Sequence, residues 1–247
     1  MVNGVDDRQL AAVLGRFARL AAHLLDEPGA WLGDGVSEQS HGLLGRLRGV
    51  GEGTRRLLTG RLHPGVAGWD QVPDADRDRW WVRRIEAVAA PVAATPRVAG
   101  ALADRLPLQG ALGAAAAGLA VCAVAREHGV DRPEDWVPLL ARVLFERDLT
   151  RPAAVPTLEE AEAAAAGPDA AAEPPPGVAR RVASGLWRLA TILWSLPGVF
   201  DDRPRGALVW RALGRLPVVG LAAGILDERG AVRRAADETR ELLARSA

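Results

Sequence analysis

The side chains that could do chemistry are few and lie far apart in the sequence. The histidines are His23, His41, His63 and His128, and none has a second histidine, a cysteine or a carboxylate at metal-ligand spacing on the same helix face. The single cysteine, Cys122, lies in an alanine-rich apolar stretch, which favours a buried small side chain over a nucleophile. Neither a metal site nor a thiol catalyst is therefore predicted.

Paired carboxylates and phosphate-binding loops give no stronger signal. Asp201–Asp202 and Asp227–Glu228 are adjacent pairs, and adjacent residues on a helix point in different directions, so such pairs typically mark helix starts or ends. The sequence contains no P-loop, no G-x-G-x-x-G after a strand and no G-x-S-x-G. We therefore predict a protein that is not an enzyme, with no catalytic residues, no metal and no cofactor.

The net charge and the N-terminal residues indicate which partners and which cellular location to expect. The 31 basic residues balance the 31 acidic ones, so no net positive field favours nucleic acid, and we expect no nucleic-acid partner. The first residues, MVNGVDDRQLAAVLGRF, carry acidic side chains where a secretory signal would carry basic ones. These features predict a cytoplasmic protein.

Helical periodicity runs through most of the chain, and strand signals are nearly absent. The sequence therefore predicts an all-α fold, a multi-helix bundle with Gly/Ala-rich central helices. Asp131 is the expected N-cap of one helix, and Pro107 is expected to break another. The expected helices span 6–26, a stretch within 38–60, 74–90, 97–127 in two segments, 131–147, 178–196 and 229–245.

Composition divides the chain into three parts. Residues 150–177 hold six prolines and five acids against one arginine, with almost no large apolar side chain, which is typical of a linker. One short Ala/Glu helix is expected inside it. The predicted organisation is an N-terminal helical region over 1–149, an acidic Pro/Ala-rich linker over 150–177, and a C-terminal helical region over 178–247 that packs on the first.

Small residues recur at a spacing of four in the two most apolar stretches. Such a spacing lets two helix backbones approach closely. The stretches RLPLQG at 105–110 and RLPVVG at 215–220 also resemble each other, which suggests two proline-initiated helices packed together. The predicted helix-packing residues are Gly110, Ala114, Gly118, Pro217, Gly220 and Gly224.

Three segments bear on membrane association. Residues 108–125 would reach roughly 27 Å as a helix, against a hydrocarbon core of about 30 Å, but few of their side chains are strongly apolar. Residues 216–226 are too short to span a bilayer. The expected helix 178–196 is amphipathic, with Trp187 and Trp194 at the border of its apolar face and Arg188 on its polar stripe. These three residues are the candidate face for a membrane or a partner.

The two apolar blocks, LPLQGALGAAAAGLAVCAVAREHGVDRPEDWVPLLARVL (106–144) and LGRLPVVGLAAGILDERGAVRRAADET (213–239), resemble the EcsC-like family. The matching positions are Ala125, His128 and Gly129 in the first block and the PVVG run at 217–220 in the second. The long acidic linker, and the lack of an asparagine after the closing glycines, depart from the family pattern. The resemblance implies a helical, membrane-associated accessory protein without established catalytic residues.

Two interpretations follow for the function. The leading one is a non-enzymatic, membrane-associated accessory protein on the cytoplasmic face, peripheral to or shallowly inserted in the inner membrane. Its partner would be the membrane surface or a membrane protein complex, and most of it would pellet with membranes. The alternative is a soluble all-α interaction or scaffold protein whose Gly/Ala-rich helices are buried in the bundle. A homo-oligomer is compatible with both interpretations.

Overall fold

The computed structural model describes residues 6–27, 62–94, 106–149, 155–166, 179–196 and 224–246. Within these ranges all regular secondary structure is helical, and the predicted all-α multi-helix bundle is confirmed. The elements are α1 (Asp7–Leu25), the 3-10 turn η2 (Trp69–Gln71), α4 (Asp74–Ala94), α5 (Leu106–Glu127), α6 (Pro133–Phe145), α7 (Leu158–Ala165), α8 (Ala179–Trp194) and α10 (Gly224–Ser246).

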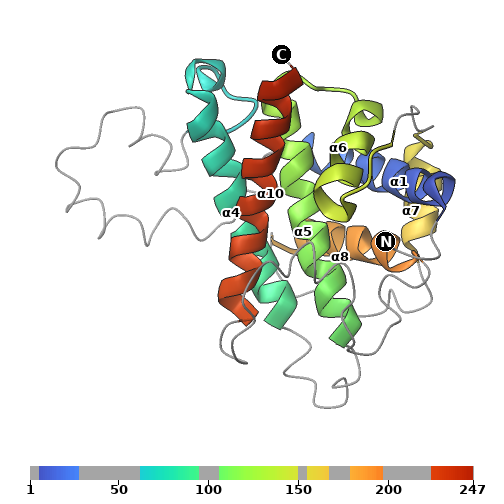
Figure 1. The fold of residues 1–247 in the computed structure, drawn as a ribbon. Helices are drawn as coiled ribbons and strands as arrows, with labels where there is room; N and C mark the ends of the chain where they lie inside the picture. Colours follow the sequence, from blue (N-terminus) through green and yellow to red (C-terminus); the bar gives the residue numbers. More distant parts are fainter. Residues whose placement is uncertain are drawn as a thin grey trace.

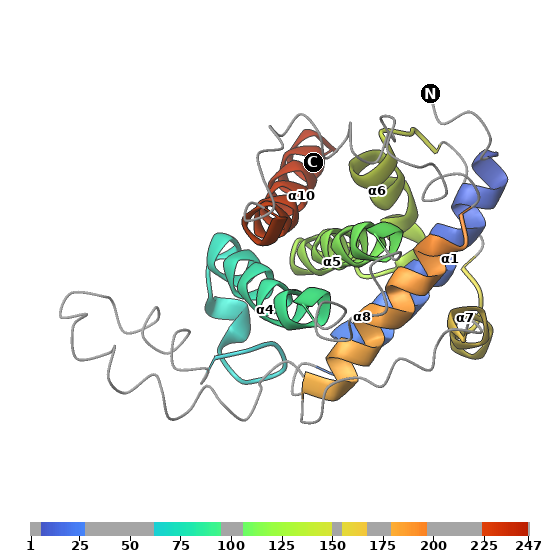
Figure 2. The same ribbon diagram turned by 90° about the horizontal axis from the view of Figure 1, so that it is seen from below.

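Helix α5 is the centre of the bundle. It contacts α1, α4, α6, α8 and α10, and Figure 2 shows it between α4 and α10 on one side and α1 and α8 on the other. Every residue from Ala114 to Ala125 is buried. Most of these side chains are alanines, whose small volume lets several helices approach one axis. This arrangement confirms the expected Gly/Ala-rich central helix.

Helices α1, α6 and α8 cover one side of α5 with large apolar side chains. Figure 1 shows α1 and α8 lying across the upright α5. Both helices are amphipathic at the helical period, so their leucines and the phenylalanine gather on the face toward α5. The fully buried side chains on this side include Leu14, Phe17 and Leu20 of α1, Leu140 of α6, and Leu186, Leu189 and Ile192 of α8.

Helices α4 and α10 lie along the other side of α5 (Figure 1). The two helices are antiparallel, because Asp78 near the start of α4 pairs with Arg240 late in α10, and Glu86 pairs with the earlier Arg233. Over 230–245, where the side chains of α10 are described, its buried apolar residues are small: Ala231, Val232, Ala235 and Ala236.

The helix ends agree with the sequence in part. Helix α1 begins at Asp7, within one residue of the expected start at 6, whereas the residue that precedes α6 is Arg132 and not Asp131. The reason is Pro133, the first residue of α6, which restricts the residue before it to an extended backbone, seen at Arg132 as a ψ of 129°. Pro107 is the second residue of α5, in agreement with the proline-initiated helix predicted from RLPLQG, and the segment expected before it lies outside the described residues. The helix expected within 38–60 lies outside the described residues.

Within the described segment 155–166, inside the expected linker, Leu158–Ala165 form the short helix α7. Thr157 starts it with a capping box, in which the Glu160 amide donates to the threonine hydroxyl and the Thr157 amide donates to the Glu160 carboxylate. Ala161 and Ala165 are buried against the bundle. The Arg19 side chain of α1 donates a hydrogen bond of 2.9 Å to the carbonyl of Pro156. This part of the linker is therefore packed on the bundle rather than extended.

Candidate functional site

A buried carboxylate at the end of α5 joins three elements. Glu127 is 7% exposed and accepts hydrogen bonds from the indole N–H of Trp81 at 2.7 Å, from that of Trp69 at 3.1 Å, and from the Arg77 guanidinium at 3.0 Å. Trp69 belongs to η2, and Arg77 and Trp81 belong to α4. An ionised acceptor makes these bonds stronger than bonds between neutral groups. Glu127 thus fixes the start of α4 against the end of α5.

Next to this contact, a second buried carboxylate, that of Asp78 on α4, joins α4 to the end of α5 and to α10. The Asp78 side chain is 3% exposed, and its Oδ2 lies 3.1 Å from Nε2 of His128 and 3.4 Å from Nε of Arg240. Burial raises the pKa of Asp78, and the hydrogen bond from His128 and the charge of Arg240 oppose that rise. The other oxygen, Oδ1, has no hydrogen-bond partner in the described part of the chain.

The turn after α5 places His128 at this junction. Gly129 has a φ of +82°, a left-handed conformation that glycine adopts without a steric cost. The amide of Val130 bonds to the carbonyl of Ala125 at 2.9 Å, and the amide of Gly129 to that of Arg126 at 3.0 Å, which together form a Schellman motif. His128 is therefore the C-cap residue of α5, and Asp78 lies within its reach.

The arrangement has limited chemical scope. An aspartate that holds a histidine is a common way to orient a general base, which then needs a nucleophile or a substrate proton within reach. Among the described residues, the only side chain that hydrogen-bonds to His128 is Asp78, and no three His, Cys, Asp or Glu side chains are placed to hold a metal ion. What the geometry does directly is to tie three helices together at one end of the bundle.

One further pair extends the contact between α4 and α10, and a group of ring contacts lies within η2 and α4. Glu86 is 8% exposed and accepts two hydrogen bonds from Arg233, at 2.8 and 3.1 Å. Trp80, between the two indoles bound to Glu127, packs edge-on against Trp69 and Trp81. The guanidinium of Arg84 lies 5.4 Å from the ring centre of Trp80, within cation–π range.

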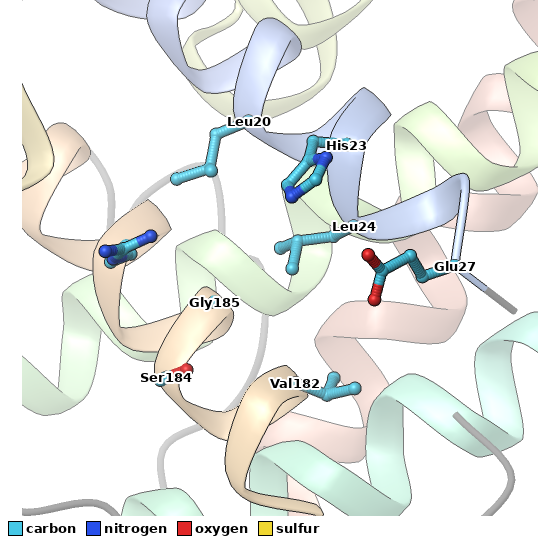
Figure 3. A pocket seen from close by; sticks show the side chains of 8 residues that line it. Leu20, His23, Leu24, Glu27, Val182, Ser184 and Gly185 are labelled. Carbon is cyan, nitrogen blue, oxygen red and sulfur yellow. The ribbon is translucent and has the colours of Figure 1, made fainter. Parts of the chain in front are cut away.

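A hollow of about 170 Å³ lies between α1 and α8, where the two helices cross at Gly185 (Figure 3). A Cβ at Gly185 would overlap the side chain of Leu24, so the glycine is what allows this close crossing. The lining mixes apolar and polar groups: Leu20, His23, Leu24, Glu27, Val182, Ser184, Gly185 and Arg188. His23 and Arg188 are exposed at its rim.

The predicted small-residue positions of α5 have different surroundings. A Cβ at Gly118 would lie 2.7 Å from Cζ of Phe17 and 3.1 Å from Cδ1 of Leu144, so this glycine is the close contact of α5 with α1 and α6. Ala114 is buried. Gly110 is half-buried, and no atom lies within 4 Å of a Cβ built on it. Of the three predicted helix-packing residues of α5 (Gly110, Ala114 and Gly118), which we call the small-residue stripe, only the later ones therefore make a tight contact.

The predicted partner of that stripe is described only in part. Pro217 and Gly220 lie outside the described residues, so the expected proline-initiated helix is untested. Gly224 is the first residue of α10, and α10 does pack on α5.

The predicted partner face of α8 is partly covered. Trp187 and Trp194 are half-buried and pack against the core. Arg188 is exposed and pairs with Glu162 of α7 at 3.0 Å. Of the three residues, Arg188 therefore contacts α7, and the two tryptophans pack on the core.

Sequence reasoning missed the carboxylate cluster, by which we mean Glu127 and Asp78 with the side chains that bind them. Asp78 and His128 are 50 residues apart, and no local spacing connects them. The available signal was the E-H-G run at 127–129, which puts polar side chains and a helix-ending glycine directly after a buried apolar helix.

Cys122 is buried, as expected from its surroundings, and burial raises the pKa of its thiol. Both features oppose thiolate formation, which nucleophilic cysteines require.

Comparison with protein-family models, with curated proteins and with solved structures finds no match to this chain.

Proposed function

We propose that the chain is a non-enzymatic, all-helical interaction or scaffold protein that works in the cytoplasm through contacts with other proteins. The observation that carries the proposal is the position of α5. This helix is the one element in the described ranges long and apolar enough to cross a membrane, over Gly110–Glu127. Yet 78% of those residues are buried by the protein itself. Its apolar surface is therefore used inside the bundle.

The neighbours of α5 support the same conclusion. Asp78 and Glu86 of α4 are buried carboxylates that pair with arginines of α10, and both helices lie along α5. Ionisable side chains are costly at membrane depth and are rare there. A helix surrounded by such pairs suits the core of a protein in water better than a membrane span.

A second candidate function is a membrane-associated accessory protein on the cytoplasmic face, which the EcsC-like resemblance also implies. The observation that favours it is α8, on which Trp187 and Trp194 are partly exposed next to the exposed Arg188. Tryptophan and arginine are both favoured at membrane interfaces. Any such contact would be peripheral, through the surface of α8, because the apolar face of that helix is buried against the bundle.

Fractionation of the expressed full-length chain separates the two functions. The interaction protein is expected in the high-speed supernatant as a monodisperse species, whose mass from light scattering also gives the oligomeric state. A chain that pellets with membranes and needs detergent for release would contradict the proposal.

Flotation with vesicles of mixed zwitterionic and anionic phospholipid tests the peripheral alternative directly. Under the proposed function the wild type does not float with the vesicles. Flotation that is lost in Arg188→Glu but kept in Arg245→Glu, a matched exposed arginine on α10, would favour membrane association instead.

A further inference from the structure

Helix α4 carries two pairs of an indole and a guanidinium, and in each pair the two residues are one helical turn apart. Arg77 and Trp81 are four residues apart and both donate to the carboxylate of Glu127, at 3.0 and 2.7 Å. Trp80 and Arg84 are also four residues apart, in the opposite order along the helix. Residues at this spacing lie on the same helix face. The first pair therefore shows that an indole and a guanidinium of this helix can hold one carboxylate together.

The second pair, Trp80 and Arg84, has no acceptor in the described part of the chain. Trp80 is 6% exposed, and its indole nitrogen is buried without a hydrogen-bond partner. Arg84 is half-buried, and among the described residues its guanidinium makes no hydrogen bond or ion pair but lies 5.4 Å from the ring centre of Trp80. Burial lowers the pKa of Arg84. Buried polar groups without a partner are rare, so two donors in contact with each other point to an acceptor from outside the chain.

The surroundings of the second pair favour an acidic ligand. Residues 79–85 of α4, RWWVRRI, hold three arginines and no acid. Arg83 is exposed and pairs with no carboxylate of the described residues, and the nearby Glu86 is already bound by Arg233 of α10. Among the described helices, α4 lies at the edge of the bundle (Figure 2), and Arg84 is in part exposed, so its guanidinium can be reached from solvent. The planar guanidinium matches a carboxylate with two parallel N–H groups.

We infer that Trp80 and Arg84 form a binding site for a glutamate or aspartate side chain of an acidic segment in a partner protein. Arg84 binds the carboxylate, and the indole N–H of Trp80 is the second donor, as that of Trp81 is for Glu127. Because the N–H of Trp80 is buried, the half-exposed Arg84 side chain shifts to admit the ligand oxygen, a rotamer change that is fast at exposed positions. Arg83, next to the site, attracts a further acid of the same segment. This inference rests on the proposed function, since it names the chemistry of the partner.

The indole N–H of Trp80 reports binding directly in the NMR spectrum of the full-length chain with isotopically labelled tryptophan nitrogen. Its signal is the one that disappears in Trp80→Phe. Titration with the synthetic peptide acetyl-GEGEG-amide, whose only charged groups are its two glutamates, should shift this signal until the site is saturated. The neutral peptide acetyl-GQGQG-amide should not shift it. No saturable shift with the glutamate peptide, or equal shifts with both peptides, would overturn the inference.

Two variants test whether Arg84 itself holds the carboxylate. Arg84→Gln removes the charge and the paired N–H groups at a half-exposed position, and should weaken binding of acetyl-GEGEG-amide about tenfold, the typical loss for one charge-assisted hydrogen bond. Arg245→Gln removes the same charge from an exposed arginine of α10 that pairs with Glu241, and should leave the affinity unchanged. Equal losses in the two variants would overturn the site, because they would show a general attraction between charges.

Two further results separate the possible ligands and the two proposals. Inorganic phosphate at the same concentration should shift the Trp80 signal less than the glutamate peptide does, and an equal shift would overturn the acidic protein partner in favour of a general anion site. A soluble, monodisperse chain whose Trp80 signal does not respond would keep the proposed function and remove only this inference. A chain that pellets with membranes would contradict the proposed function and, with it, the partner inferred from it.

Discussion

The two sides of α5 are stabilised by different physical means. On the side of α1, α6 and α8, large apolar side chains fill the space, and Phe17 lies directly over Gly118. On the side of α4 and α10, α4 also buries large apolar side chains, among them Trp81 and Ile85, but the described buried side chains of α10 are small, and buried carboxylates add contacts with arginines, tryptophans and a histidine. One central helix thus supports a side held mainly by apolar burial and a side on which directional polar bonds are added to apolar burial.

This difference between the two sides separates what holds the helices together from what sets their position along one another. Apolar burial is strong and has little directional preference, so it holds α1 and α8 on the bundle without fixing every contact. Charged hydrogen bonds require defined positions of both partners, so the two bonds from Arg233 to Glu86, together with the ion pair between Asp78 and Arg240, set where α10 lies along α4. Mutations on the two sides should therefore differ in size and in what they change.

The largest expected effect is on the apolar side. Phe17→Ala should lower the free energy of unfolding by about 3–5 kcal/mol, because the ring is fully buried and leaves a cavity over Gly118. Val232→Ala, at the largest side chain that α10 is described to bury, should cost only about 1–2 kcal/mol. Urea denaturation measures both. Equal losses would show that the two sides do not differ as described.

The next effect concerns Glu127. Glu127→Ala leaves two indole N–H groups and one guanidinium without their acceptor, and should cost about 3 kcal/mol. Glu127→Gln keeps one acceptor oxygen and should cost clearly less. Urea denaturation gives the losses, and near-ultraviolet circular dichroism of the folded variants reports the surroundings of the indoles. If alanine and glutamine cost the same, the hydrogen bonds to Glu127 contribute little.

A smaller effect distinguishes two glycines of α5. Gly118→Ala puts a methyl group 2.7 Å from Cζ of Phe17, so the ring must shift, at a cost of about 1–3 kcal/mol. Gly113→Ala adds the same methyl group where no atom lies within 4 Å, and should stabilise the helix by up to about 1 kcal/mol. Thermal unfolding of the pair gives the two signs directly. A stabilised Gly118→Ala variant would mean that α5 and α1 are less closely packed than described.

The smallest effect is the pH dependence that Asp78 contributes. Burial raises its pKa in the folded state, so the contribution to stability is present at acid pH and is lost as pH rises through the raised pKa. The hydrogen bond from His128 and the charge of Arg240 offset part of the free-energy cost of ionising the buried Asp78. Between neutral pH and about pH 4, near the unfolded pKa of an aspartate, the wild type should therefore gain stability relative to Asp78→Asn on acidification. A difference that does not change with pH would contradict a buried ionised Asp78.

Helical period and capping residues made most of the described helices predictable. Helix α1 has seven apolar residues on one face and lies within a residue of its expected bounds, because amphipathic spacing is a local property. Helix α7 carried its own start signal, the T-L-E-E run at 157–160, which is a capping box. Its packing on α1 and α8 could not be predicted in the same way, since it depends on the bond from Arg19 and on two buried alanines.

The carboxylate cluster shows where sequence reasoning stops. A histidine is assessed from its neighbours in the sequence, and His128 has no carboxylate partner on its own helix face. Asp78 reaches it only because α4 and α5 are antiparallel, so that the start of one meets the end of the other. Arg240 joins only after α10 has packed beside both. The site is therefore a product of tertiary structure and has no short motif.

Three tryptophans, one in η2 and two in the first half of α4, give the molecule an internal optical reporter. The ring centres of Trp69 and Trp80 are 5.6 Å apart, and those of Trp80 and Trp81 are 4.9 Å apart, with the rings close to perpendicular. The electronic transitions of indoles at such separations couple and give paired bands of opposite sign in circular dichroism. Because the chain has no tyrosine, its ultraviolet emission comes almost entirely from tryptophan. Light absorbed and emitted by the unlabelled protein therefore carries a signal from the junction of α4 and α5.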